Sequence, residues 1–193
     1  MRAPLVLASS SPYRRALLER LGVPFEVINP AVDETPQPGE TAERLALRLA
    51  EAKARAVADR VPAALVVGSD QVAEVDGAKV GKPGAHVHAV RQLEAISGKR
   101  VVFHTAVCLW NGVDRRSQLA NVPTTVQFRH LNAEQIERYL VREHPYDCAG
   151  SARIEGLGIA LVEKVVSEDP TALIGLPLAT LVTMLQKEGI AVI

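Results

Sequence analysis

Short apolar runs alternate along the chain with longer segments in which apolar residues recur at helical spacing. Leu5–Ala8, Phe25–Ile28 and Ala64–Val67 are typical of strands, the last of them buried and ending at Gly68-Ser69-Asp70. The helical segments have capping residues or Gly and Pro at their ends, and they cover Pro12 to Gly22, Thr41 to Asp59, His86–Ser97, Asn132–Glu143 and Pro177–Glu188. This alternation predicts an α/β fold.

Two dipeptides with the signature of tight turns add antiparallel pairing to that fold. Asp76-Gly77 lies between two short apolar strands, and Asn111-Gly112 follows the long run Val101–Trp110. Both are typical of two-residue hairpins, so the sheet is predicted to be mixed. There is no internal repeat or low-complexity linker, which favours one domain over residues 1–193, with room for two lobes.

Composition and charge narrow the function classes. The chain has 193 residues, 48% of them hydrophobic, and its 22 basic and 22 acidic residues cancel. No overall field therefore attracts nucleic acid or an anionic membrane, and any affinity for phosphate must come from local clustering. The apolar run near the start is too short for a secretion signal or a membrane span, so a soluble cytoplasmic protein is expected. Cys108 and Cys148 lack metal-binding spacing and are expected to be free buried thiols.

Hydroxyl and guanidinium groups gather at the start of the first predicted helix. Ser9, Ser10 and Ser11 precede Pro12, and Arg14 and Arg15 stand in the first turn. A helix N-terminus offers unpaired N–H groups and the positive end of the dipole, which suits an anion. Ser11 could equally be a simple N-cap. Two arginines at the unfavourable end of a helix favour the phosphate-binding interpretation.

Carboxylates follow two of the predicted strands. Asp70 comes at the end of the buried strand, where ligand sites collect in α/β folds, although a turn or capping role is the simpler alternative. Asp33-Glu34 lies in the loop before the long helix, and adjacent acidic residues in a loop are usually just solvated. Glu34 is the better metal ligand only if that loop folds back toward Asp70.

Two lysines complete the set of candidate phosphate ligands. Lys53 shares a helix face with Ala46, Leu49 and Val57, and snorkelling at the rim of the core is its commoner explanation. Lys82 stands in Gly81-Lys82-Pro83 and could be a solvated turn. A triphosphate carries roughly four negative charges, so tight binding needs several converging cations plus a metal.

Taken in order, several motifs of this chain resemble the Maf family of nucleotide pyrophosphatases. They are the serine loop, Asp33-Glu34, Gly68-Ser69-Asp70-Gln71, Gly81-Lys82-Pro83, Cys148-Ala149-Gly150-Ser151, Glu155-Gly156-Leu157-Gly158 and Ile174-Gly175-Leu176-Pro177-Leu178. The resemblance implies a mixed α/β sheet with flanking helices, like that of inosine triphosphatases, in two lobes around a central cleft. It also implies a cytoplasmic homodimer, a divalent metal (Mg²⁺ or Mn²⁺), and hydrolysis of nucleoside triphosphates to monophosphate and pyrophosphate.

Roles for individual residues follow from the same resemblance. Asp70 is expected to be the general base and, with Glu34, to hold the metal. The phosphates are expected to contact Ser9, Arg14, Arg15, Lys53 and Lys82.

Within the family the chain is similar to the YceF-like branch, which acts on 7-methyl-GTP. Tyr13, Gln71 and Glu155 are the discriminating positions, and the branch acting on dTTP and UTP typically has Thr and Gln in place of the last two. N7-methylguanine is a cationic base, which an aromatic face and a carboxylate would favour over a neutral one. Tyr13 departs from the Trp of the YceF pattern, so a looser preference is expected.

Other functions stay open at this level. The chain could be a nucleotide-binding regulator of cell division with incidental hydrolysis, which would not need Asp70, or a dTTP and UTP pyrophosphatase. A nucleic-acid-binding module fits poorly with a neutral chain of 4% aromatic content. His104, His130 and His144 are scattered, and structural roles are expected for them.

Overall fold

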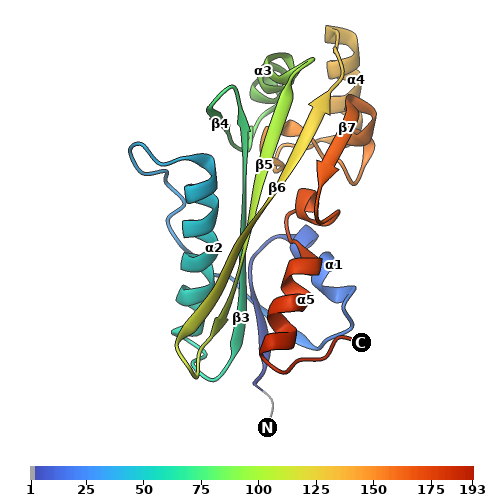
Figure 1. Cartoon of the computed structure of the whole chain (residues 1–193). Coiled ribbons are helices and arrows are strands. Elements are labelled where there is room, and N and C mark those ends of the chain that lie inside the picture. Colours follow the sequence, from blue (N-terminus) through green and yellow to red (C-terminus); the bar gives the residue numbers. More distant parts are fainter. Residues whose placement is uncertain (1–2) are drawn as a thin grey trace. The chain divides into compact units, whose positions relative to one another are not determined.

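A computed structural model describes residues 3–193, which form a mixed α/β fold, as predicted (Figure 1). One sheet has the strand order β2-β1-β3-β5-β6-β7, and β4 pairs with β3. The strands are β1 (Leu5–Ala8), β2 (Phe25–Ile28), β3 (Leu65–Val75), β4 (Ala78–Val80), β5 (Arg100–Asn111), β6 (Arg116–Phe128) and β7 (Val162–Ser167). The α-helices are α1 (Pro12–Glu19), α2 (Ala42–Ala58), α3 (His86–Ile96), α4 (Ala133–Glu143) and α5 (Leu178–Lys187).

The chain divides into two compact units, in keeping with the two predicted lobes. The first comprises Met1–Gln71, Thr105–Val122 and Asp169–Ile193, and the second comprises Val72–His104 and Pro123–Glu168. Three strands, β3, β5 and β6, have residues in both units. The single domain over residues 1–193 and its central cleft stay predictions.

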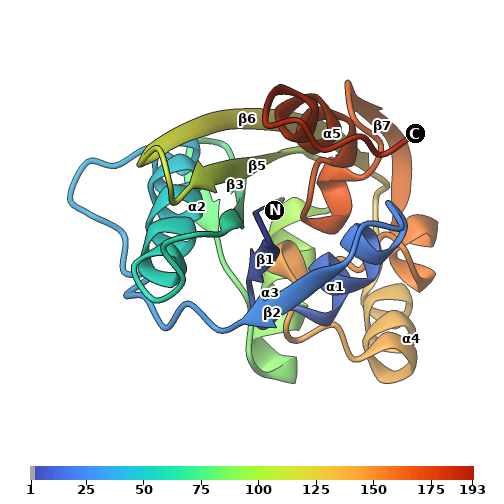
Figure 2. The ribbon, with the colours of Figure 1, turned by 90° about the horizontal axis from the view of Figure 1, so that it is seen from below.

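In the first unit, helices cover both faces of a sheet in which β1 pairs in parallel with β2 and β3. Figure 2 shows α2 on one side of β3 and α1 and α5 on the other. Apolar side chains of α1, α5 and the strands pack together, including Leu7, Leu18, Val67, Leu109 and Leu181. Burying one Leu or Val side chain of this kind contributes roughly 1.5–3 kcal/mol.

In the second unit, the hairpin between β3 and β4 turns at Asp76 and Gly77, with φ of 49° and 79°. Positive φ at both positions is the twist that a two-residue hairpin needs, so this prediction is confirmed. α4 begins with a capping box between Asn132 and Gln135, and β7 pairs antiparallel with β6. No helix within residues 3–193 is long and apolar enough to cross a membrane.

Two predicted boundaries are wrong. β3 does not end at Gly68-Ser69-Asp70 but continues to Val75, so Asp70 lies inside the strand, just past its parallel pairing with β1. The loop after Asn111 is longer than two residues, because the Asn111 side chain accepts hydrogen bonds from the amides of Val113 and Asp114. Neither Cys108 nor Cys148 is in a disulfide, as predicted. Cys108 is buried, which raises the pKa of its thiol to about 12, whereas the prediction of a buried thiol is wrong for Cys148, which is only partly buried.

Candidate active site

The alternation of side chains along β3 sends its polar residues to two different neighbours. Successive residues of a strand point to opposite faces of the sheet. Asp70 lies on the face covered by α2, where it contacts Lys53. Ser69 and Gln71 lie on the opposite face and contact the chain segment that precedes α5. One short stretch of strand thus supplies a carboxylate to one side and two neutral polar groups to the other.

A close approach between β3 and α2 brings Lys53 to Asp70. At Gly68, an added Cβ would lie 2.2 Å from the carbonyl oxygen of Ala50 in α2, so only glycine permits this packing. One turn further along the helix, Lys53 Nζ donates to Asp70 Oδ1 at 2.6 Å. Lys53 is 5% exposed and Asp70 is 6% exposed. The interpretation of Lys53 as a snorkelling residue is therefore wrong, because its ammonium ends on a buried carboxylate.

The acidic loop before α2 reaches the same ammonium. Glu34 Oε1 lies 2.6 Å from Lys53 Nζ, although the Glu34 side chain is 55% exposed. Its neighbour Asp33 turns away and accepts hydrogen bonds from the amide and hydroxyl of Thr35, which lower the pKa of its carboxyl. The loop thus folds back toward Asp70, which was the condition for Glu34 to be the better metal ligand of the two acidic residues. We call Lys53, Asp70 and Glu34 the Lys53 group.

The serine loop folds around the start of α1. Ser11 is the N-cap, and its hydroxyl accepts from the amide of Arg14 at 3.4 Å. Ser9 is 4% exposed, and its hydroxyl accepts from the amide of Ser11 at 3.1 Å. The capping interpretation of Ser11 is confirmed, and Ser9 follows directly after β1 at the end of its parallel pairing with β3.

The two arginines of α1 have different surroundings. Arg14 is partly buried, and its Nε donates to the carbonyl of Gly175 at 2.8 Å. Burial lowers the pKa of the Arg14 guanidinium, and the charges of Asp70 and Glu34 oppose that shift, as expected of a cation beside the Lys53 group. Arg15 instead pairs with Glu19 at 2.9 Å on the exposed side of the helix, where both line a surface hollow of about 440 Å³. Its role in phosphate binding stays a prediction.

Gln71 is held by groups that the sequence did not single out. Its Nε2 donates to the carbonyls of Ala172 and Leu173 at 3.1 and 3.0 Å, and to the hydroxyl of Thr105 at 3.0 Å. Thr105 is fully buried in β5. A polar residue within that apolar run is the one feature of the sequence that could have indicated a partner for Gln71. The other two partners are main-chain carbonyls, which every residue has, so the sequence could not identify them.

The remaining candidates keep their predicted roles as predictions. Tyr13 is the second residue of α1 and is half-buried. Lys82 and Glu155 belong to the second unit, where Lys82 is exposed and Glu155 Oε1 lies 3.6 Å from Arg153 Nε. Burial of its side chain raises the pKa of the Glu155 carboxyl, with smaller contributions from Glu143 and Asp147 in the same direction and an opposing one from Arg153.

The Lys53 group offers two ligands of the kind that Mg²⁺ prefers. Asp70 and Glu34 each place a carboxylate oxygen 2.6 Å from one Lys53 Nζ, so both reach the same small region. Within residues 3–193, no group of three or more His, Cys, Asp or Glu side chains could hold a metal ion. Mg²⁺ is usually held by one or two carboxylates, with substrate phosphates and waters completing its shell. Two carboxylates beside the cationic side chains of Lys53 and Arg14 fit that pattern.

Comparison with known proteins adds the family. The profile of the Maf-like protein family matches residues 4–188. The chain belongs to this family. Its Maf-like relatives include a 7-methyl-GTP pyrophosphatase of Ralstonia nicotianae, 58% identical over 187 residues, covering 97% of this chain and 96% of the relative. Proteins of the same name are 56% identical in Methylobacillus flagellatus (98% of this chain, 99% of the relative) and 55% identical in Nitrosospira multiformis (98% and 96%).

Proposed function

We propose that this chain hydrolyses 7-methyl-GTP to the monophosphate and pyrophosphate, and so clears a modified nucleotide from the pool. The observation that carries the proposal is the buried Lys53–Asp70 pair joined by Glu34. Burying charged groups is costly, and a cluster of buried charges beside further cations is typical of a functional site. The relatives that carry this name cover nearly the whole chain, which supports the choice of substrate.

The residues of the first unit suit attack of water on the α-phosphorus. Asp70 would accept the proton of the attacking water, and its carboxylate is already held in place by Lys53. Arg14 and Lys53 would bind phosphate oxygens and neutralise the charge that builds up as pyrophosphate leaves. Ser9, at the end of β1, would add a hydroxyl donor. Arg15 and Lys82 would contribute if the bound substrate reaches them.

A divalent metal is part of the proposal. Glu34 and Asp70 would hold it, and a bound Mg²⁺ or Mn²⁺ would polarise phosphoryl oxygens and offset their charge. We further propose that Tyr13 and Glu155 favour the cationic methylated base, and that the protein is a cytoplasmic homodimer.

The experiment is a panel of pyrophosphate-release assays. Wild type and Asp70→Asn are compared on 7-methyl-GTP, GTP, dTTP, UTP and CTP, with Mg²⁺, with Mn²⁺ and with EDTA. We expect the fastest turnover on 7-methyl-GTP, none with EDTA and a nearly inactive variant. Faster turnover of dTTP or UTP would move the chain to the other branch. No hydrolysis at all, with nucleotide binding retained, would favour a binding regulator.

A further inference from the structure

A buried carboxylate outside the Lys53 group organises the start of α5. Asp169 is 2% exposed, and both of its oxygens accept hydrogen bonds. Oδ1 accepts from the amide and hydroxyl of Thr171 at 2.9 and 2.7 Å, and Oδ2 accepts from the amides of Ala179 and Thr180 at 2.8 and 3.4 Å. Because these four groups are all donors, two acceptor oxygens fit here, whereas the NH₂ group of an amide does not.

The same contacts close a loop, which we call the Asp169 loop (residues 169–177). The Thr171 hydroxyl that donates to Asp169 also accepts from the amide of Leu178 at 2.8 Å, so the loop is tied to the first residue of α5. Gly175 has φ of 119°, which a residue with a side chain rarely adopts. The path of the loop is therefore fixed from both ends by Asp169 and Thr171.

The carbonyls of the Asp169 loop hold side chains of the candidate active site. Ala172 and Leu173 accept from Gln71, and Gly175 accepts from Arg14 Nε and Ser69 Oγ, each at 2.8 Å. A carbonyl can only accept, so the Gln71 amide must turn its nitrogen to the loop. Its Oε1 then points away from the loop, as a hydrogen-bond acceptor of fixed orientation.

We propose that Asp169 is a positioning residue for substrate recognition. Through the Asp169 loop it fixes Gln71 with Oε1 toward the nucleobase and fixes Arg14 beside the phosphate site. An acceptor at that position suits the adjacent N1–H and 2-amino donors of guanine, whereas in adenine N1 is itself an acceptor and the 2-position has no amino group. This inference rests on the proposed function for its substrate, but the geometry of the loop is independent of it.

The test compares Asp169→Asn and Thr171→Val with Thr171→Ser, which keeps the hydroxyl. We measure kcat/KM for 7-methyl-GTP and for ATP, a purine of similar size with a different edge. The ratio of the two is expected to fall at least about tenfold in the first two variants, since a site built for a hydrogen bond rejects the wrong partner strongly. Thr171→Ser should keep the wild-type ratio.

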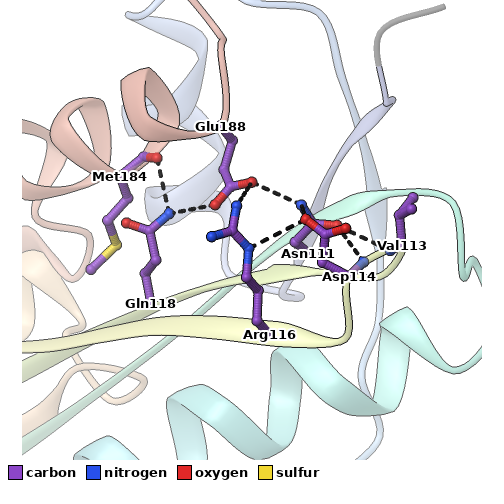
Figure 3. A network of polar contacts seen from close by, with 7 residues as sticks. All are labelled: Asn111, Val113, Asp114, Arg116, Gln118, Met184 and Glu188. Carbon is purple, nitrogen blue, oxygen red and sulfur yellow. Dashed lines mark hydrogen bonds and ion pairs between the residues drawn. The ribbon is translucent and has the colours of Figure 1, made fainter.

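Glu188→Gln is the matched control at the other end of α5. The Glu188 side chain is 5% exposed and accepts from Asn111, Arg116 and Gln118 at 2.8, 3.1 and 2.8 Å (Figure 3). It makes none of the contacts of the Asp169 loop, so its loss should lower stability and leave the ratio within about twofold of wild type. A loss of the ratio in this control would mean that the ratio follows stability alone, which would overturn the proposal.

A second readout does not depend on activity. The side-chain NH₂ signals of Gln71, identified by their absence in Gln71→Glu, are followed by NMR in hydrogen-exchange experiments. We expect protected signals in wild type and loss of protection in Asp169→Asn and Thr171→Val. If both variants fold and keep the protection and the base ratio, the positioning role is wrong. If wild type hydrolyses no nucleotide, the proposed function fails, and the NMR result alone decides the positioning role.

Discussion

Asp70 and Glu188 are both buried carboxylates of the first unit, but their surroundings differ. Glu188 has both oxygens occupied by donors from Asn111, Arg116 and Gln118 (Figure 3). Asp70 shares a single ammonium with Glu34, and its Oδ1 accepts the hydrogen bond from Lys53 Nζ. A carboxylate whose two oxygens both accept from protein donors stabilises a fold, whereas two carboxylates that converge on one buried cation are typical of a functional site. The difference separates a structural site from a candidate active site.

The largest expected difference between Asp70 and Glu188 is in the activity that remains when each carboxylate is replaced by an amide. Asp70→Asn keeps the size of the side chain and an oxygen for Lys53 but removes the proposed base, so kcat should fall about 10²–10⁴-fold. Glu188→Gln, which also removes one buried negative charge, should keep most of the activity. The measurement is pyrophosphate release from 7-methyl-GTP, with circular dichroism to confirm folding. Similar activity losses in the two folded variants would contradict the distinction.

Removing the shared cation should cost stability as well as activity. Lys53→Met leaves the buried Asp70 carboxylate without its partner, and breaking a buried pair in this way costs about 3–5 kcal/mol. The exposed Arg55 of the same helix, 5.9 Å from the Trp110 ring, is the control, and Arg55→Met should cost at most about 1 kcal/mol. Urea unfolding measures both. Combining Lys53→Met with Asp70→Asn should cost less than the sum, and strict additivity would argue against the pair.

The smallest expected effect concerns Glu155 and pH. Because burial raises the pKa of its carboxyl, Glu155 takes up a proton at a higher pH than an ordinary glutamate as the solution is acidified. Its negative charge is then lost, so the preference for 7-methyl-GTP over GTP should decline by a few fold. Steady-state kinetics from neutral to acidic pH measure the ratio. Glu155→Gln should show a low ratio that does not change with pH. If this variant instead has the same ratio and the same pH dependence as wild type, Glu155 takes no part in base recognition.

The spacing of apolar residues was sufficient to predict the helices and strands, but it did not predict where all of them end. Helices around Thr41 and Asn132 began where capping chemistry predicted, because a cap is a local interaction. The continuation of β3 through Asp70 was missed, since Gly68-Ser69-Asp70 has the composition of a strand end. In the structure Gly68 instead serves the close packing of α2, which is a tertiary contact.

The candidate site was predictable as a set of residues but not as an arrangement. The sequence identified Asp70, Glu34 and Lys53, while their convergence depends on a loop and a helix that meet only in the folded chain. Arg14 and Arg15 were both predicted to bind phosphate, and the sequence did not show that Arg15 pairs with Glu19, one helical turn further on, while Arg14 contacts the carbonyl of Gly175. The contacts of Gln71 were out of reach because its partners include backbone carbonyls.

The position of the new P–O bond tests the central claim most directly. Wild type is incubated with 7-methyl-GTP and Mg²⁺ in ¹⁸O-labelled water, the products are separated, and the ¹⁸O content of each is measured by mass spectrometry. Attack on the α-phosphorus predicts one labelled oxygen in 7-methyl-GMP and none in pyrophosphate. Label in pyrophosphate, or release of orthophosphate and the diphosphate, would contradict the account of the reaction.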